Sequence, residues 1–295
     1  MRRQSDTMDI TPSATSQKFR GRRLLVASMH GKERAIAPML EAQLGIICIT
    51  EPDLDTDRYG TFTGEVERKG SPLQTVRIKC LEAMNHTGFD LGIATEATFG
   101  PHPQLGLIPS HHEIMLLMDT RLGLEIRVSM LTTETNFASR IISSEEELMA
   151  FARSVGFPAH GLILRTIYGS GKKIKKGITN AAELSAAYRL LSLTGGTLQA
   201  ETDMRAHMNP TRMSMIRSLT GKLLYKMISE CLSCATPGFG EEELIPGLPC
   251  RACGQPTRSP LSRKTSCSRC GNSVTESFPD GRTHEEPGAC QYCNP

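Results

Sequence analysis

The sequence has no apolar run that approaches the roughly 18–20 residues of a membrane-spanning helix. No apolar stretch follows Arg2 and Arg3, because residues 4–17 are polar, so a secretory signal is not indicated. These absences exclude a membrane-embedded protein and predict a cytoplasmic one. We expect residues 1–21 to form a disordered tail.

A large charge excess is also missing. The chain has 34 Lys and Arg against 31 Asp and Glu, a net charge of +3, which is not the footprint of a nucleic-acid-binding protein. Residues 231–295 contain six basic and seven acidic residues. An acidic segment is a poor general binder of nucleic-acid phosphates. This segment therefore suits a structural appendage or a protein-docking module, and a nucleic acid is the less favoured partner.

A Walker A motif is absent too. The basic, glycine-rich segment 169–177 comes closest, but Thr166 stands where the first glycine is needed. Lys173 stands where the motif requires Ser or Thr. We interpret this segment as a solvated loop.

Cysteine is scarce until residue 231, with only Cys48 and Cys80 before it. The other eight cysteines form four Cys-x-x-Cys pairs, the spacing of metal-binding knuckles: Cys231 and Cys234, Cys250 and Cys253, Cys267 and Cys270, Cys290 and Cys293. Two pairs supply the four thiolates of one tetrahedral site, so we predict two structural Zn2+ ions. An iron–sulfur cluster or a redox dithiol is the alternative.

The pairing of the knuckles is not determined by their spacing. Residues 275–285 (TESFPDGRTHE) resemble a hairpin with a Pro-Asp-Gly turn between the third and fourth pairs. Such a hairpin favours sequential pairing, the first pair with the second and the third with the fourth. Nested and crossed pairing stay open. Gly254 and Gly271 directly follow their pairs, where a knuckle often needs a positive φ.

The rest of the chain alternates between strand and helix patterns. The expected strands are 24–28, 46–50, 90–95, 113–119, 124–131, 161–167 and 196–202. The expected helices are 29–45, 71–88, 145–156, 181–192 and 210–229. We predict an α/β domain over residues 22–230, with a mixed sheet flanked by helices, followed by a small double zinc ribbon over residues 231–295.

Three candidate ligand sites lie at expected strand ends, where open α/β sheets bind ligands. The loop 28–32 joins a strand to a helix N-terminus and offers backbone amides and Lys32 to phosphate. Glu96 ends the strand 90–95 and could hold a cation. The segment 203–212 is the third. The expected helix 71–88 also projects Arg77 and Lys79.

These positions carry a resemblance. The run 27–32 (ASMHGK), followed by Ala35 and Ile36, resembles the strand–loop–helix that opens the inosine/xanthosine triphosphate pyrophosphatases. Residues 93–97 (IATEA) resemble that family's acidic strand end, which helps hold Mg2+. Thr211 and Arg212 resemble the start of its late basic helix. His30 stands where the family usually has Asn.

The resemblance implies a Mg2+-dependent pyrophosphatase of non-standard nucleoside triphosphates. Lys32 would neutralise the triphosphate, and Glu96, with Glu65 or Glu134, would hold Mg2+. The metal would activate water for attack at the α-phosphate, and pyrophosphate would leave. Further nucleotide contacts would come from Ser28, His30, Arg77, Asp203, Arg205, His207 and Arg212.

The whole chain is also similar to a bacterial family of unknown function that joins such an α/β domain to a C-terminal double zinc ribbon. This similarity implies no activity. Two hypotheses follow for the function. One is a Mg2+-dependent nucleotide pyrophosphatase or related phosphohydrolase. The other is a non-catalytic zinc-ribbon protein whose α/β domain binds a nucleotide or a protein partner. The sequence does not indicate an oligomeric state.

Overall fold

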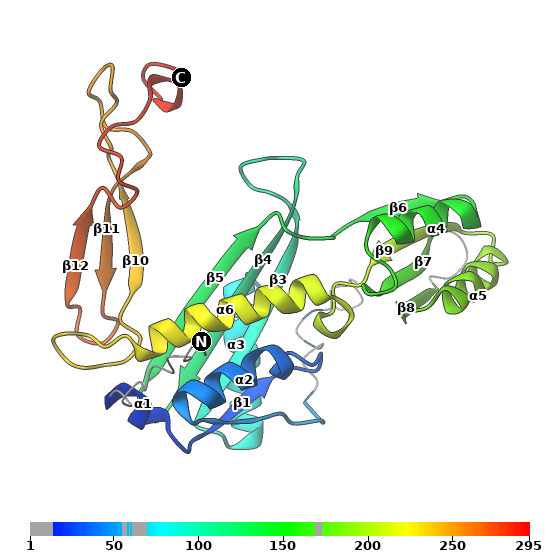
Figure 1. Ribbon diagram of the computed structural model, residues 1–295, viewed down its shortest axis with the longest axis horizontal. Helices are drawn as coiled ribbons and strands as arrows, with labels where there is room; N and C mark the ends of the chain where they lie inside the picture. Colours follow the sequence, from blue (N-terminus) through cyan, green and yellow to red (C-terminus); the bar gives the residue numbers. More distant parts are fainter. Residues whose placement is uncertain (1–13, 55–57, 59, 61–69, 169–172) are drawn as a thin grey trace, which may run out of the picture. The chain divides into compact units, whose positions relative to one another are not determined.

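The computed structural model describes residues 14–54, 58, 60, 70–168 and 173–295. The chain divides into two compact units (Figure 1). The larger unit is Phe19–Leu223, and the smaller one combines Met1–Lys18 with Leu224–Pro295. In the described part of the chain, no helix is both long enough and apolar enough to cross a membrane.

The larger unit contains a five-stranded mixed sheet in the order β2-β1-β3-β4-β5. β1 is parallel to β2 and β3, whereas β3, β4 and β5 form an antiparallel meander. The strands are β1 Arg23–Ala27, β2 Ile47–Ile49, β3 Leu91–Pro101, β4 Pro109–Asp119 and β5 Leu124–Thr132.

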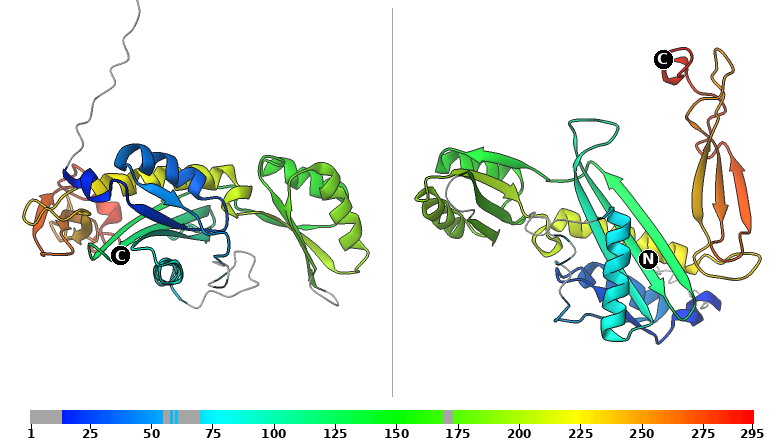
Figure 2. Two further views of the ribbon diagram at one scale, coloured as in Figure 1. Left: turned by 90° about the horizontal axis from the view of Figure 1, so that it is seen from below. Right: turned by 180° about the vertical axis from the view of Figure 1, so that it is seen from behind.

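Helices cover both faces of this sheet. α2 (Glu33–Leu44) and α6 (Pro210–Ile228) lie on one face, and α3 (Pro72–Thr87) lies on the other (Figures 1 and 2). β2 and β3 flank β1 on opposite sides. Right-handed crossovers leaving in opposite directions place their helices on opposite faces. The carboxyl end of β1 is therefore the switch point where open α/β sheets bind ligands.

A second sheet of the larger unit is antiparallel, with the order β6-β9-β7-β8. Its strands are β6 Ser139–Ile142, β7 Leu162–Tyr168, β8 Ile174–Ile178 and β9 Thr197–Thr202. α4 (Glu145–Ser154) and α5 (Ala181–Ser192) bury their apolar faces against it in one core cluster. Ser144 and Asn180 cap these helices by accepting backbone N–H bonds.

The fold class is confirmed as mixed α/β with helices and a C-terminal small sheet. The predicted mixed sheet is the five-stranded one, and the strands β6 to β9 build a second sheet and core that the sequence did not distinguish. Periodicity identifies strands but not which of them pair. β8 was also missed, since its lysines and Gly177 read as a loop although its backbone pairs with β7.

The third strand is longer than the sequence predicted. β3 continues through Glu96 to Pro101, because β4 pairs with it along its whole length. Glu96 therefore lies within a strand and not at its end. Lys79 does not project into solvent but is 8% exposed, since it forms a buried ion pair with Glu96.

The predicted disordered tail is partly wrong. α1 (Ala14–Phe19) falls within the expected range 1–21, and Phe19 is fully buried. Lys18 of this helix donates to the backbone carbonyl of Ala235 over 2.6 Å. Residues 1–13 lie outside the described residues.

The smaller unit contains a three-stranded antiparallel meander: β10 Glu241–Pro246, β11 Pro260–Ser266 and β12 Ser273–Ser277. The hairpin predicted over residues 275–285 was wrong. Residues 275–277 belong to β12, which pairs back onto β11, and the chain then turns at Phe278–Gly281 without forming a further strand in the described residues.

Candidate functional sites

Each Cys-x-x-Cys pair of the smaller unit forms a tight knuckle. The first cysteine of each pair accepts a backbone N–H from the residue four positions later, from Ala235, Gly254, Gly271 and Asn294 respectively. Gly254 and Gly271 have φ of 71° and 72°, as predicted. Ala235 takes the same left-handed conformation at φ 52°. Both sulfurs of a knuckle thereby point the same way.

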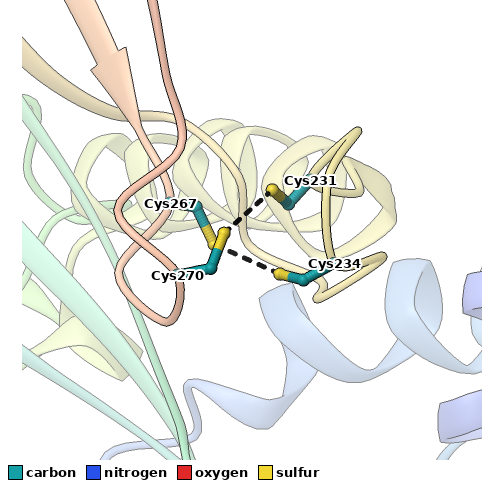
Figure 3. A group of neighbouring side chains, drawn as sticks. All are labelled: Cys231, Cys234, Cys267 and Cys270. Atoms are coloured by element: carbon teal, nitrogen blue, oxygen red, sulfur yellow. Dashed lines mark hydrogen bonds between the residues drawn. The ribbon is translucent and has the colours of Figure 1, made fainter.

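The knuckles meet in two groups of four cysteines, each with its sulfurs within 4.8 Å of one another. In the first group, Cys231 lies 3.6 Å from Cys270, and Cys234 lies 3.8 Å from Cys267 (Figure 3). In the second group, the corresponding sulfur distances are 3.9 Å and 3.8 Å. A zinc–sulfur bond of about 2.3 Å gives tetrahedral S···S edges of about 3.8 Å. Both groups fit one metal ion each.

The pairing is crossed, which corrects the sequential arrangement that the sequence favoured. The first knuckle joins the third, and the second joins the fourth. The meander explains this. The first knuckle precedes β10 and the third follows β11, so both lie at one end of the sheet. The second knuckle follows β10 and the fourth follows β12, so both lie at the other end. Antiparallel strands return the chain to the same end only after two passes.

In the larger unit, the side chain of Glu113 on β4 is fully buried and forms the centre of a polar network. Its Oε1 accepts from Thr95 Oγ1 over 2.8 Å and from Arg212 Nη2 over 3.0 Å. Its Oε2 accepts from Arg212 Nε over 3.0 Å and from His111 Nε2 over 2.7 Å. We call Lys32, Thr95, His111, Glu113 and Arg212 the Glu113 network.

Lys32 joins this network at the carboxyl end of β1. Its Nζ donates to Thr95 Oγ1 over 2.8 Å and to the Thr95 carbonyl over 3.4 Å. β1 pairs with β3 only as far as Ala94, so the next residue of β3, Thr95, faces the notch beyond the end of β1. Lys32 fills that notch and is 8% exposed.

The charges of the network do not cancel. Lys32 and Arg212 oppose one carboxylate, so the formal charge is +1 (2 − 1) when Lys32 is protonated. Burial, and then the charge of Arg212, lowers the pKa of Lys32 to about 7. Burial alone would raise the pKa of Glu113, but Arg212 and the hydrogen bond from His111 hold it well below its ordinary value.

Glu96 is held apart from this network. Thr95 and Glu96 are consecutive in β3, so their side chains point to opposite faces of the sheet. Thr95 faces α2 and α6, where Lys32 and Arg212 lie. Glu96 instead faces α3 and accepts from Lys79 over 2.5 Å. The sheet thus brings Lys32 and Arg212 together and turns the Glu96 side chain to the other face, where it pairs with Lys79 and acts on Lys32 through its charge alone.

An open cleft of about 220 Å³ lies beside the β1–α2 loop (Ser28–Lys32). It is lined by Ser28, Met29, Gly31 and Glu33, and by Thr50, Glu51 and Pro52, which follow β2. In the described chain, no side chain caps the start of α2, but the N–H groups of Arg34 and Ala35 in its first turn donate to the backbone carbonyls of Gly31 and Lys32. The positive end of the helix dipole still favours an anion at this place.

His30 lies in the same loop and stacks on His207, with 5.2 Å between the ring centroids. Burial, and then the charge of Lys32, lowers the pKa of His30 to about 3. His207, Arg212 and Arg205 lower it further, so cationic side chains lie near this loop, whereas Glu33 and Glu51 line the cleft. The fully buried Asp203 carboxylate balances Arg205 in an ion pair of 2.6 Å.

The remaining predicted site residues are elsewhere. Arg77 pairs with Glu125 at the start of β5, on the edge of the sheet away from β1. Glu134 is exposed in the segment after β5, and its backbone N–H donates to Thr132. Glu65 lies outside the described residues. Neither Arg77 nor Glu134 takes part in the contacts that join Lys32 to Arg212.

Thr95, His111 and Glu113 were not predicted as site residues from the sequence. The last two precede the apolar run of β4 at alternate positions, a spacing that places both on one face of a strand. That spacing was the available signal. It was overlooked because the expected strand began at Glu113, which left His111 outside it.

The fold and the cysteine geometry define a mixed α/β protein with a C-terminal ribbon that carries two four-cysteine metal-binding sites. Residues 79–295 match the family described as "Domain of unknown function (DUF6671)", and the chain belongs to this family. The matched range includes Glu113, Arg212 and all eight ribbon cysteines, whereas Lys32 precedes it.

The chain has no match among the curated proteins. Among solved structures, it is similar to a competence or damage-inducible protein from Enterobacter asburiae. The identity is 15%, the match covers 48% of this chain and 87% of that one, and the TM-score is 0.24. A similarity at that TM-score carries no argument about fold or function.

Proposed function

We propose that the larger unit binds the phosphate groups of a nucleotide, or of another phosphorylated small molecule, at the β1–α2 loop. The ribbon would hold two structural zinc ions, because all-thiolate tetrahedral sites leave no open coordination position. The observation that carries the first proposal is the uncompensated cation of the Glu113 network, directly beside the uncapped first turn of α2.

Burying an unbalanced positive charge is costly unless an anion compensates it. Lys32 and Arg212 oppose a single carboxylate, and their charges add to the effect of burial in lowering the pKa of His30 in the same loop. A phosphate at the N-terminus of α2 would compensate this charge and meet the positive end of the helix dipole. Both effects favour a phosphate ester over a neutral ligand.

The cleft is smaller than the roughly 300–1,000 Å³ of a complete small-molecule site. Its volume of about 220 Å³ suits the phosphate part of a ligand and leaves the rest to neighbouring surfaces. A nucleoside triphosphate is therefore the first ligand to test.

Mg2+-dependent hydrolysis with release of pyrophosphate is the second candidate function. It is favoured by Glu51, a carboxylate that lines the cleft at the end of β2. Together with phosphate oxygens, Glu51 would hold Mg2+, a cation that prefers oxygen ligands. Glu96 is less suited to this role, since Lys79 engages its carboxylate on the opposite face of the sheet.

Titration calorimetry with inorganic pyrophosphate, ATP and ITP tests the binding proposal. We expect the wild type to bind at least one of these ligands and Lys32→Met to lose most of the affinity. Lys222→Met is the matched control, because Lys222 is an exposed lysine of α6 in the same unit. Absence of binding by the wild type would reject the proposal.

Adding Mg2+ and measuring pyrophosphate release separates the two candidates. Binding without release supports a non-catalytic nucleotide-binding protein. Release that disappears in Glu51→Gln, with nucleotide binding retained, supports hydrolysis.

A further inference from the structure

Glu113 accepts four hydrogen bonds, two on each carboxylate oxygen. Its donors come from three separate elements: β3 supplies Thr95, β4 supplies His111 and α6 supplies Arg212. A buried carboxylate with this many donors stays ionised. Glu113 is therefore a fixed negative charge that can only accept hydrogen bonds.

This fixed role determines the direction of the next hydrogen bond. The Thr95 hydroxyl has a single hydrogen and must donate it to Glu113. Its lone pairs are then presented to Lys32, whose Nζ lies 2.8 Å away. Within the described residues, two of the three ammonium hydrogens of Lys32 have partners, and both partners belong to Thr95.

Resting on the proposed phosphate site, we propose that Glu113 is its positioning residue. It orients Lys32 through the Thr95 hydroxyl, and it fixes the guanidinium of Arg212 through two parallel hydrogen bonds. Glu113 itself touches no ligand in this arrangement. It acts by setting where the two cations stand and how much charge Lys32 carries.

The charges that face Lys32 support this role. Arg212 from α6 and Lys79 from α3 disfavour its protonation, whereas Glu113 from β4 and Glu96 from β3 favour it. His30, in the same loop, responds to the charge of Lys32 in return. Glu113 is the first of the two favourable charges, so its neutralisation would leave less of Lys32 protonated at neutral pH.

Glu113→Gln tests the inference, because it keeps the shape of the side chain and removes its charge. We expect its affinity for inorganic pyrophosphate to fall roughly tenfold or more at pH 7.5. Part of that loss should recover at pH 6, where Lys32 is protonated again. The wild type should show the same loss of affinity with rising pH, but centred at a higher pH than in the variant, near the Lys32 pKa of about 7.

Asp119→Asn is the matched control. Asp119 lies on the same strand β4, is buried, and forms a two-point ion pair with Arg22 at the far end of the strand. Its loss should destabilise the protein without moving the pH profile of binding. Equal shifts of the profile in both variants would overturn the positioning role.

Thr95→Val provides a second route, should Glu113→Gln fail to fold. It removes the hydroxyl between Glu113 and Lys32 but keeps the β-branched shape. We expect the same acid shift of the binding profile, and rescue by Thr95→Ser. Weak binding by both the Val and the Ser variants would contradict the hydroxyl link.

NMR titration of the Lys32 side chain in the ligand-free protein separates this inference from the proposed function. Support requires a wild-type midpoint near neutral pH that moves lower in Glu113→Gln and stays in place in Asp119→Asn. A midpoint near the ordinary lysine value would overturn the inference. If the wild type binds neither pyrophosphate nor nucleotides, the proposed function fails, and the titration still decides whether Glu113 controls Lys32.

Discussion

Arg212 and Glu113 stand 99 positions apart and form a buried, two-point ion pair, with 3.0 Å for each of its hydrogen bonds. The pair joins the first turn of α6 to β4. Asn209 prepares the geometry, because its Oδ1 accepts the backbone N–H of Arg212 and begins the helix there. The Arg212 guanidinium also donates to the Met204 carbonyl over 2.7 Å.

Removing Arg212 should leave the buried Glu113 carboxylate without its cationic partner. We expect Arg212→Leu to lower the free energy of unfolding by about 3–5 kcal/mol, measured by urea denaturation. Arg217→Leu on the exposed side of the same helix should change it by less than about 0.5 kcal/mol. Similar losses of unfolding free energy in the two variants would show that the buried ion pair does not contribute more to stability than an exposed residue.

The crossed knuckles predict a pattern of metal loss. The wild type should contain two zinc ions per chain by elemental analysis after dialysis against a mild chelator. Cys231→Ser with Cys267→Ser removes two ligands of the same site and should leave one zinc. Cys231→Ser with Cys250→Ser damages both sites and should leave none. Sequential pairing would give the reverse result.

Lys32 makes the stability depend on pH in a defined direction. Its folded pKa of about 7 lies below the ordinary 10.5, so the unfolded chain binds more protons between these values. The free energy of unfolding should therefore rise from pH 7 toward pH 10. Conversely, the protonated Lys32 destabilises the folded state most below pH 7.

Lys32→Met should accordingly stabilise the protein at pH 6, on the order of 2–4 kcal/mol, while weakening phosphate binding. Thermal or urea unfolding across pH 6–9 measures the effect. Lys222→Met serves as the exposed control. A Lys32→Met variant that is less stable than the wild type at pH 6 would contradict the depressed pKa.

A substitution of Phe19 tests whether α1, which lies within the predicted tail, is folded. It is fully buried, so Phe19→Ala should cost about 3–5 kcal/mol of unfolding free energy. Leu193→Ala, at a position 86% exposed, should have almost no effect. A tail without structure would make the two substitutions equally mild in urea denaturation.

The sequence by itself determined the features that arise from neighbouring residues. Each Cys-x-x-Cys pair forms its knuckle locally, and Gly254 and Gly271 take the positive φ that the turn needs. Helix starts at Asn180 and Asn209 followed from side chains that cap the amide three positions away. Spacing along the chain is sufficient evidence for such interactions, since their partners are close in sequence.

Only the tertiary structure decided which distant segments meet. The crossed cysteine sites follow from the meander of β10, β11 and β12, and Glu96 turned away from Lys32 because β3 continues and alternates its faces. Glu113 begins the expected strand 113–119, and it gained its partners because β3 and α6 lie beside β4. Strand pairing depends on contacts between remote residues, so a single sequence identifies the strands without revealing what they bring together.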